Sequence, residues 1–240
     1  MDPIQSSLSP NIHPEAVAAL LPEFGGAPFC EINLDEEALR WHEQCPDLFA
    51  GGANPLLDPA VCQRFLDGVH ARLGVVWSYG GYLENRSHIL QGSYLERTGG
   101  FMHLGVDFNV RQSALVAAPR PGTVILVDDD HDRDGGWGPR VFLKLDGDPL
   151  DNPVLIFAHL QGIEAEPGTR LSQGTVFAEV GGPPDNGNWI PHLHVQAIHS
   201  GKFFEVLVGK FAELDGYGSL GRIEDLQQNF PDPLPIIGWR

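Results

Sequence analysis

The sequence predicts a mainly β protein, an antiparallel β-sandwich or barrel-like domain with a helical appendage at its N-terminus. From Val75 onward, apolar runs rich in Val, Ile, Leu and Phe follow one another, separated by Gly, Pro, Asp and Asn. No helical pattern lies between these runs, whereas parallel strands would need helical crossovers. The first 73 residues, in contrast, carry helix signals.

Three helices are expected in the N-terminal part. His13-Pro14 begins the first, which extends to Leu21, because proline is well tolerated in a first helical turn. Residues 33–44 start acidic and end basic, as the helix dipole favours. The third helix is capped by Asp58 and stopped by Gly74; its apolar face is formed by Val61, Phe65, Val69 and Leu73.

The strand-like runs fill the middle of the chain. In order they read VVWSYGGYL, HILQGSYL, HLGVDFNV, ALVAAPRPGTVILV, PRVFLKL, PVLIFAHL, TVFAEV and HLHVQAI. In the tail, residues 203–214 suit a strand or a short helix and residues 223–230 a turn of helix. Residues 231–240 are expected to be extended, because proline cannot continue a helix. We therefore expect an appendage over residues 1–73, a β domain over 74–205, and a C-terminal extension over 206–240 that packs on the domain.

Charge limits the partners of this protein. The 240 residues include 15 Lys and Arg against 32 Asp and Glu, a net charge of −17. Nucleic-acid binding needs a basic footprint, so we expect no nucleic-acid partner. The same charge disfavours anionic membranes, and no apolar run approaches the roughly 18 residues that a membrane span requires.

The compartment is expected to be reducing. The three cysteines, Cys30, Cys45 and Cys62, form no C-x-x-C pair and are odd in number. The N-terminal residues lack the basic region and apolar stretch of a signal peptide. We expect a cytoplasmic protein, with a periplasmic or extracellular location left open.

Three short segments carry the residues with the clearest chemistry. FMHLGVDF contains His103 and Asp107, IFAHL contains His159, and PHLHVQ contains His192 and His194. Alternate residues of a strand share a face, so His103 and Asp107 would point the same way, as would the last two histidines. Four imidazoles and a carboxylate form a ligand set that suits zinc. The residues alone leave open which of them would be ligands.

These segments resemble the lysostaphin-type zinc metalloendopeptidases, many of which cut peptidoglycan cross-links. The resemblance rests on HLGVD, AHL and PHLH, and also on SALVAAPRPGTV and PGTRLSQGTVFAEVG, and it covers roughly residues 74–200. It implies that His103, Asp107 and His194 are the zinc ligands. It also implies that His159 and His192 are catalytic and not ligands.

The last motif departs from the lytic members of that family. Trp189 and Ile190 stand where those members have small residues, and Gln196 stands where glutamate is common. The sequence NGNWIPHLH is more similar to the version found in fusions with a sugar-kinase-like domain and an aminotransferase. The residues expected to bind the metal are all present despite this departure. Because of the departure, the resemblance does not by itself imply a peptidoglycan substrate.

The expected chemistry is metal-assisted hydrolysis. Zinc held by three protein ligands keeps an open position for water and can polarise a scissile carbonyl. The chain lacks an H-E-x-x-H motif. His159 and His192 are therefore the candidates for proton transfer, and their separate roles stay open.

Two other groups of residues are candidates for binding. Tyr82, Asn85, Arg86 and Arg97 precede the first ligand and could line a substrate groove, where arginine would suit a carboxylate or phosphate group. The acidic segment Asp130–Asp134 has the opening of a calcium loop, but Val141 stands where the loop needs glutamate. A solvated hairpin tip is the favoured interpretation, and cation binding there stays open.

The sequence thus predicts a zinc-dependent hydrolase of the metallopeptidase type that acts on a peptide or amide bond, with peptidoglycan among the candidate substrates. Two alternatives remain: a zinc-containing regulatory or binding module, and a hydrolase of a small cytoplasmic amide or metabolite. The scissile bond and the oligomeric state are left open.

Overall fold

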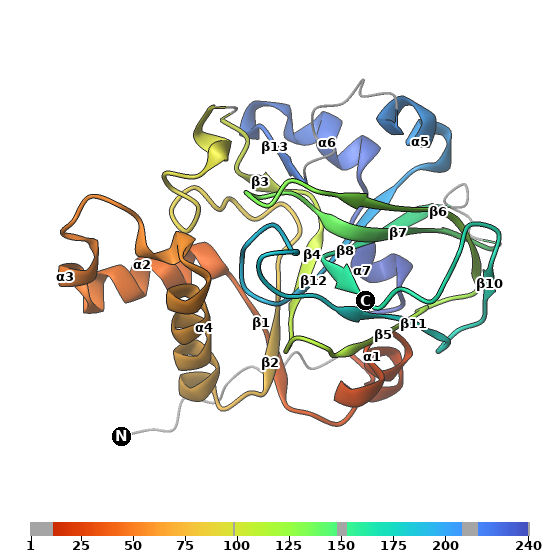
Figure 1. Ribbon diagram of the computed structural model, residues 1–240, viewed down its shortest axis with the longest axis horizontal. Coiled ribbons are helices and arrows are strands. Elements are labelled where there is room, and N and C mark those ends of the chain that lie inside the picture. Colours follow the sequence, from red (N-terminus) through yellow and green to blue (C-terminus); the bar gives the residue numbers. More distant parts are fainter. Residues whose placement is uncertain (1–11, 98, 148–152, 208–215, 240) are drawn as a thin grey trace.

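The computed structural model describes residues 12–97, 99–147, 153–207 and 216–239 (Figure 1). The N-terminal part contains α1 (Pro14–Leu20), β1 (Phe29–Ile32), α2 (Leu34–Gln44), α3 (Pro46–Phe49) and α4 (Pro59–Leu73), with short 3-10 helices at Pro22–Phe24 and Pro55–Leu57. The C-terminal part contains α5 (Ser200–Leu207), β13 (Tyr217–Gly218), α6 (Ile223–Asn229) and α7 (Pro233–Ile236), and a 3-10 turn at Leu220–Arg222.

A large sheet of eight strands forms the middle of the molecule, in the order β1-β2-β4-β12-β8-β7-β6-β10. A second sheet has the order β5-β11-β9, and β13 pairs with β3. The bounds are β2 (Trp77–Gly80), β3 (Met102–His103), β4 (Val106–Asn109), β5 (Leu115–Ala117), β6 (Gly122–Asp130), β7 (Gly138–Leu145), β8 (Val154–Ala158), β9 (Leu160–Gln161), β10 (Arg170–Leu171), β11 (Val176–Val180) and β12 (Leu193–Ile198). The described pairs are antiparallel except for β1 with β2.

Both faces of the large sheet are buried, because alternate residues of its central strands enter different cores. Leu155 and Phe157 of β8 belong to the core shared with β11 and α1. Ile156 and Ala158 belong to the core shared with α5 and α6. Figure 1 shows the corresponding layers, with β5, β11 and α1 on one side of the sheet and α5 and α6 on the other. The central strands are therefore held rigidly, which fixes the side chains at their ends.

The mainly β fold with N-terminal helices is as predicted from the sequence. The α4 cap agrees in detail: Asp58 Oδ1 accepts from the backbone amides of Ala60 and Val61, and Gly74 ends the helix at φ 68°. The sandwich or barrel-like description and the three domain boundaries stay predictions. One observation bears on them: β1 of the expected appendage extends the large sheet by pairing with β2.

Three segments differ from the expectation. No strand was expected before Val75, yet β1 lies there. HILQGSYL was expected as a strand, but residues 88–97 form turns and a 3-10 helix at Tyr94–Arg97. The tail around α7 was expected to be extended, but Asp232 caps a short helix in which Pro233 occupies the tolerated first position. Among the described residues, none of the helices is long and apolar enough to cross a membrane.

His70 on α4 gives the fold a pH-dependent contact. Its Nε2 lies 2.8 Å from Ser78 Oγ on β2, and burial lowers the pKa of the imidazole. Because the folded pKa lies below the ordinary value of about 6.5, the unfolded chain binds the proton more readily. We expect the free energy of unfolding to fall as the pH drops below about 6.5, and His70→Gln to remove part of that slope. Denaturant titrations of both proteins at pH 5 and pH 8 measure how the free energy of unfolding changes with pH. An equal change in wild type and His70→Gln would contradict the expectation.

Candidate metal centre

His103 and Asp107 lie on two short strands and not on one. The chain bends at Leu104 and Gly105, so that β3 pairs with β13 while β4 lies between β2 and β12 in the large sheet. The bend brings the two side chains together, with His103 Nε2 lying 3.3 Å from Asp107 Oδ1. A Cβ atom on Gly105 would lie 2.6 Å from the ring of His194. Glycine at this bend therefore leaves the room that the His194 ring occupies.

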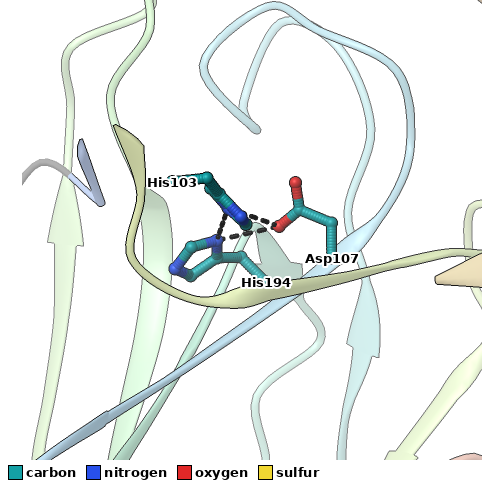
Figure 2. A group of neighbouring side chains, drawn as sticks. All are labelled: His103, Asp107 and His194. Carbon is teal, nitrogen blue, oxygen red and sulfur yellow. Dashed lines mark hydrogen bonds and ion pairs between the residues drawn. The ribbon is translucent and has the colours of Figure 1, made fainter. Parts of the chain in front are cut away.

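His194 completes a group of three buried side chains (Figure 2). It faces Asp107 directly in the β4–β12 register. Its Nδ1 lies 2.8 Å from Asp107 Oδ1 and 3.1 Å from His103 Nε2. One potential ligand atom from each of the three residues falls within 4.8 Å of the others.

The hydrogen-bond partners of His103 and His194 favour tautomers in which the ring nitrogen facing the group of three residues has a free lone pair. His103 Nδ1 lies 3.4 Å from the carbonyl oxygen of Gly81, an acceptor that keeps the proton on Nδ1 and leaves Nε2 free. His194 Nε2 lies 3.2 Å from Gln196 Oε1, which leaves Nδ1 free in the same way. Outer hydrogen bonds of this type orient the ligands in metal sites. Burial, followed by the charge of Arg86, also lowers the pKa of His103 to about 3, so the ring is neutral at pH 7.

The spacing fits a zinc ion. Tetrahedral zinc with bonds of about 2.0–2.1 Å places its ligand atoms roughly 3.3 Å apart. The three separations here, 3.3, 3.1 and 2.8 Å, are close to that value. The donor set of two neutral imidazoles and a carboxylate is also one that zinc accepts. The residues therefore fit a zinc site with an open position.

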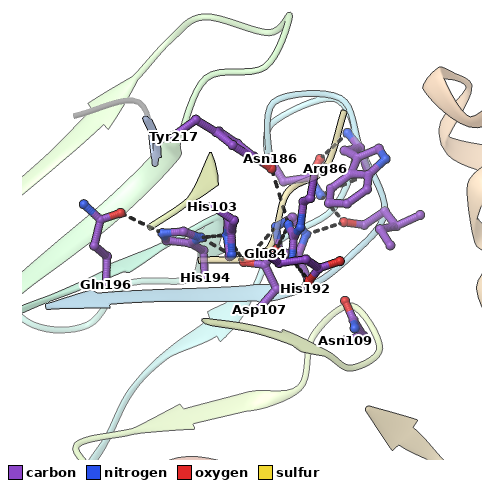
Figure 3. Close-up of polar contacts among 12 residues, drawn as sticks. Glu84, Arg86, His103, Asp107, Asn109, Asn186, His192, His194, Gln196 and Tyr217 are labelled. Carbon is purple, nitrogen blue, oxygen red and sulfur yellow. Dashed lines mark hydrogen bonds and ion pairs between the residues drawn. The ribbon is translucent and has the colours of Figure 1, made fainter. Parts of the chain in front are cut away.

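Arg86 supports Asp107 from behind the centre (Figure 3). Its Nη1 donates to Asp107 Oδ2 and its Nη2 donates to Glu84 Oε2, and the guanidinium is completely buried. Burial alone would raise the pKa of the Asp107 carboxyl, but His103 and Arg86 hold that pKa well below its usual range. Because His103 is neutral at pH 7, Arg86 is the cation that balances the carboxylate.

His159 and His192 form a pair beside the three clustered residues. Their ring centroids are 4.4 Å apart, and both side chains are buried. His159 has φ 60°, an unusual backbone conformation for this residue type, and its Nδ1 is buried with no hydrogen-bond partner among the described residues. His192 Nδ1 lies 2.7 Å from the carbonyl oxygen of Ile190, and its Nε2 lies 3.8 Å from Asp107 Oδ1. Burial lowers the pKa of both imidazoles, so both are neutral at pH 7.

All five of these residues line one cavity of about 190 Å³. Further residues of its wall come from distant parts of the chain. The segment before residue 101 supplies Tyr94, the β6–β7 hairpin supplies Asp134 and Trp137, and the C-terminal part supplies Tyr217. Trp189 lies beside His192, with ring centroids 5.2 Å apart.

The four residues expected to face a substrate lie elsewhere. None of Tyr82, Asn85, Arg86 and Arg97 is on the described cavity wall. The Tyr82 hydroxyl donates to the carbonyl oxygen of Phe230, and Asn85 accepts from the amide of Ser87. Arg97 is exposed. Arg86 is a buried counter-ion of Glu84 and Asp107. Its polar sequence neighbours gave no indication that its side chain is buried.

The acidic segment is a tight loop at the rim of the cavity. Asp130 accepts from the amides of Asp132 and Trp137, and Asp132 accepts from the amide of Asp134. These hydrogen bonds fit the interpretation of a hairpin tip, and cation binding by the loop stays untested. Tyr94, Trp137 and Tyr217 also line the cavity, and no ligand-type motif surrounds them in the sequence that would indicate this position.

One comparison with known proteins concerns residues 101–205. They match the family model described as Peptidase family M23. No curated protein sequence matches the chain.

Several solved structures are similar to parts of the chain. A zinc containing peptidase from Vibrio cholerae is 24% identical over 40% of this chain and 27% of its own, with a TM-score of 0.34. The catalytic domain of a mutant of the prophage-encoded M23 protein EnpA from Enterococcus faecalis is 24% identical over 42% of this chain and 70% of its own, with a TM-score of 0.36. The catalytic domain of lysostaphin from Staphylococcus simulans is 20% identical over 57% of this chain and 80% of its own, with a TM-score of 0.39. This chain thus spans about a quarter of the Vibrio peptidase.

The family match covers the segment that holds all three ligand-type residues and both further histidines. The match and the arrangement of these residues agree. Residues 101–205 of this chain are therefore similar to Peptidase family M23.

Proposed function

We propose that this protein is a zinc-dependent hydrolase that cleaves a peptide or amide bond. The observation that carries the proposal is the convergence of His103, Asp107 and His194 in a buried group within 4.8 Å, at a cavity that two further histidines also line. The proposed ligands are these three residues. The NGNWIPHLH motif supports a further proposal, that the domain is of the version found in kinase-like and aminotransferase fusions.

Zinc at this site would activate a water molecule and polarise the scissile carbonyl. The residues of the chain supply the proton transfers. The Ile190 carbonyl accepts from His192 Nδ1, which leaves Nε2 as the basic nitrogen. Because burial keeps the imidazole neutral, His192 is ready to accept a proton, and we assign it the role of general base.

His159 is assigned the complementary role. Its ring lies next to His192, its backbone is fixed by hydrogen bonds to Trp137 and Gly181, and it is neutral. A neutral imidazole still carries one N–H donor. We propose that this donor stabilises the reacting peptide group while His192 handles the proton of the water.

Asp107 and Arg86 keep the centre in its working charge state. The pKa of Asp107 lies well below its usual range, so the carboxylate stays ionised and available to a cation at neutral pH. Arg86 is buried and also bonded to Glu84, so its guanidinium is fixed in place. These hydrogen bonds of Arg86 are made within the protein, so they hold Asp107 in place with or without a bound substrate.

Metal content tests the ligand assignment. Wild-type protein purified without added zinc is expected to hold about one zinc ion per chain, and His194→Ala is expected to lose it, because two ligands cannot replace three. His131→Ala is the matched control, since that side chain is 78% exposed on the acidic loop. Elemental analysis after dialysis measures the effect; zinc retained by His194→Ala would remove the assignment.

Hydrolysis tests the activity itself. Purified peptidoglycan and a panel of small peptides and amides are the substrates, each assayed with and without excess chelator. Turnover that disappears with chelator and returns with added zinc supports the proposal. A fully zinc-loaded protein that cleaves none of them would favour a binding or regulatory module.

A further inference from the structure

Tyr217 is a cavity residue contributed by the chain beyond the M23 segment. It lies on β13, which pairs antiparallel with β3 so that Tyr217 is directly opposite His103. The ring centroids of the two residues are 5.4 Å apart. The carbonyl oxygen of Gly216 accepts from the amide of Leu104 at 2.8 Å, which ties this segment to the bend between β3 and β4. Gly216 and Tyr217 both line the cavity.

The hydroxyl of Tyr217 is held next to a proposed zinc ligand. Arg86 Nη1 donates to this hydroxyl at 3.3 Å and also donates to Asp107 Oδ2. The phenol oxygen and the Asp107 carboxylate therefore share one guanidinium nitrogen, as Figure 3 allows the reader to follow. Arg86 is fixed by Glu84 and by burial, so the position of the hydroxyl is defined from behind.

The bonding of the hydroxyl leaves its proton available. A tyrosine hydroxyl has one proton to donate and lone pairs that accept. Here a lone pair is used by Arg86, and none of the described residues accepts the proton. Acceptance from a cation polarises the O–H bond and strengthens it as a donor. A tyrosine hydroxyl keeps its proton at neutral pH, so the group is a neutral donor there.

We propose that Tyr217 is a catalytic residue that donates its hydroxyl proton in a hydrogen bond to the oxygen of the scissile carbonyl. The bond strengthens as negative charge develops on that oxygen, and no proton needs to be transferred. His159 and His192 lie together as one pair, whereas Tyr217 acts from the side of His103. This inference rests on the proposed hydrolase function, and it makes the C-terminal segment part of the active site.

Tyr217→Phe tests the role because it removes only the hydroxyl. Loss of one donor to a developing oxyanion lowers kcat by about 10²–10³ in comparable sites. We expect a decrease of that order in kcat, a small change in KM, unchanged zinc content and an unchanged melting temperature. Tyr82→Phe is the matched control: its hydroxyl is bonded to the Phe230 carbonyl and lies outside the described cavity wall, so kcat should not change.

A binding measurement tests the same hydrogen bond without turnover. Inorganic phosphate is a tetrahedral anion that can occupy the open side of the zinc-loaded site and accept from the hydroxyl. Hydrogen bonds to charged groups contribute about 1.5–3 kcal/mol, so calorimetry should show phosphate binding roughly ten- to a hundredfold weaker in Tyr217→Phe. Binding to Tyr82→Phe should equal wild type.

The two measurements separate the inference from the proposed function. An active wild type whose kcat is unchanged in Tyr217→Phe overturns the inference and leaves the hydrolase intact. A zinc-loaded wild type that cleaves no substrate overturns the hydrolase proposal. In that case the phosphate titration tests the Tyr217 hydroxyl by itself. Weaker phosphate binding in Tyr217→Phe supports the role of the hydroxyl as a donor toward an anion, and equal binding overturns that role.

Discussion

His192→Ala is expected to retain its zinc and to lose roughly 10²–10⁴ in kcat, the usual contribution of a positioned proton-transfer group. The residue is the proposed base because the Ile190 carbonyl accepts from Nδ1 and leaves Nε2 as the basic nitrogen. Its Nε2 lies 3.8 Å from Asp107 Oδ1, and the residue is outside the group of three potential ligands. Kinetics on a cleaved substrate together with zinc analysis measure both parts of the prediction.

Two outcomes would contradict this assignment. Loss of zinc in His192→Ala would make the residue a ligand, and a four-residue metal site would replace the one proposed. Retained zinc with an unchanged rate would make it a bystander and leave His159 as the base. His131→Ala serves as the control for a histidine substitution, because that side chain is exposed on the acidic loop.

The sequence could indicate the candidate site residues because their signal is local. His103 and Asp107 lie four residues apart, and His192 and His194 lie two apart, so short motifs carry most of the group. The expected single strand through His103 and Asp107 was wrong in detail. The space at Gly105 is occupied by the His194 ring from β12, which lies almost ninety residues further along the chain. Local spacing identified the group, and tertiary packing decided its geometry.

The fold shows the same division. The α4 helix was predictable because its cap, apolar face and stop signal are all contained within residues 58–74. In contrast, β1 has only four residues, and its parallel pairing with β2 is made across the intervening helices α2, α3 and α4, so no signal within residues 29–32 indicates it. Tyr217 had no local signal at all, since its function depends on β13 pairing with β3 more than a hundred residues earlier.

Arg86 is the clearest case in which the structure changes the role of a residue. The sequence offered it as a group that could bind a substrate carboxylate. In the structure it is completely buried and bonded to two internal carboxylates, Asp107 and Glu84. Burial opposes its charge, but these two carboxylates raise the pKa of the guanidinium well above its usual value, so it remains a cation.

Arg86→Met is therefore expected to destabilise the fold by about 3–5 kcal/mol, the usual effect of removing one partner from a buried ion pair. Methionine preserves most of the unbranched stem but leaves Asp107 and Glu84 without a cation. The matched control is Arg170→Met: the arginine side chain is 68% exposed and pairs with Asp146, so its loss should cost less than about 1 kcal/mol. Denaturant unfolding of both variants in their metal-free forms measures the difference.

The metal-free form is the informative one, because bound zinc would itself balance Asp107. If zinc is the natural second counter-ion of that carboxylate, excess zinc should recover part of the stability lost in Arg86→Met, whereas it should affect Arg170→Met no more than wild type. Without Arg86 the pKa of Asp107 should rise, so protons should compete with zinc and weaken its binding more at pH 6 than at pH 8. A loss in Arg86→Met as small as that in Arg170→Met would show that the buried carboxylates do not depend on this arginine.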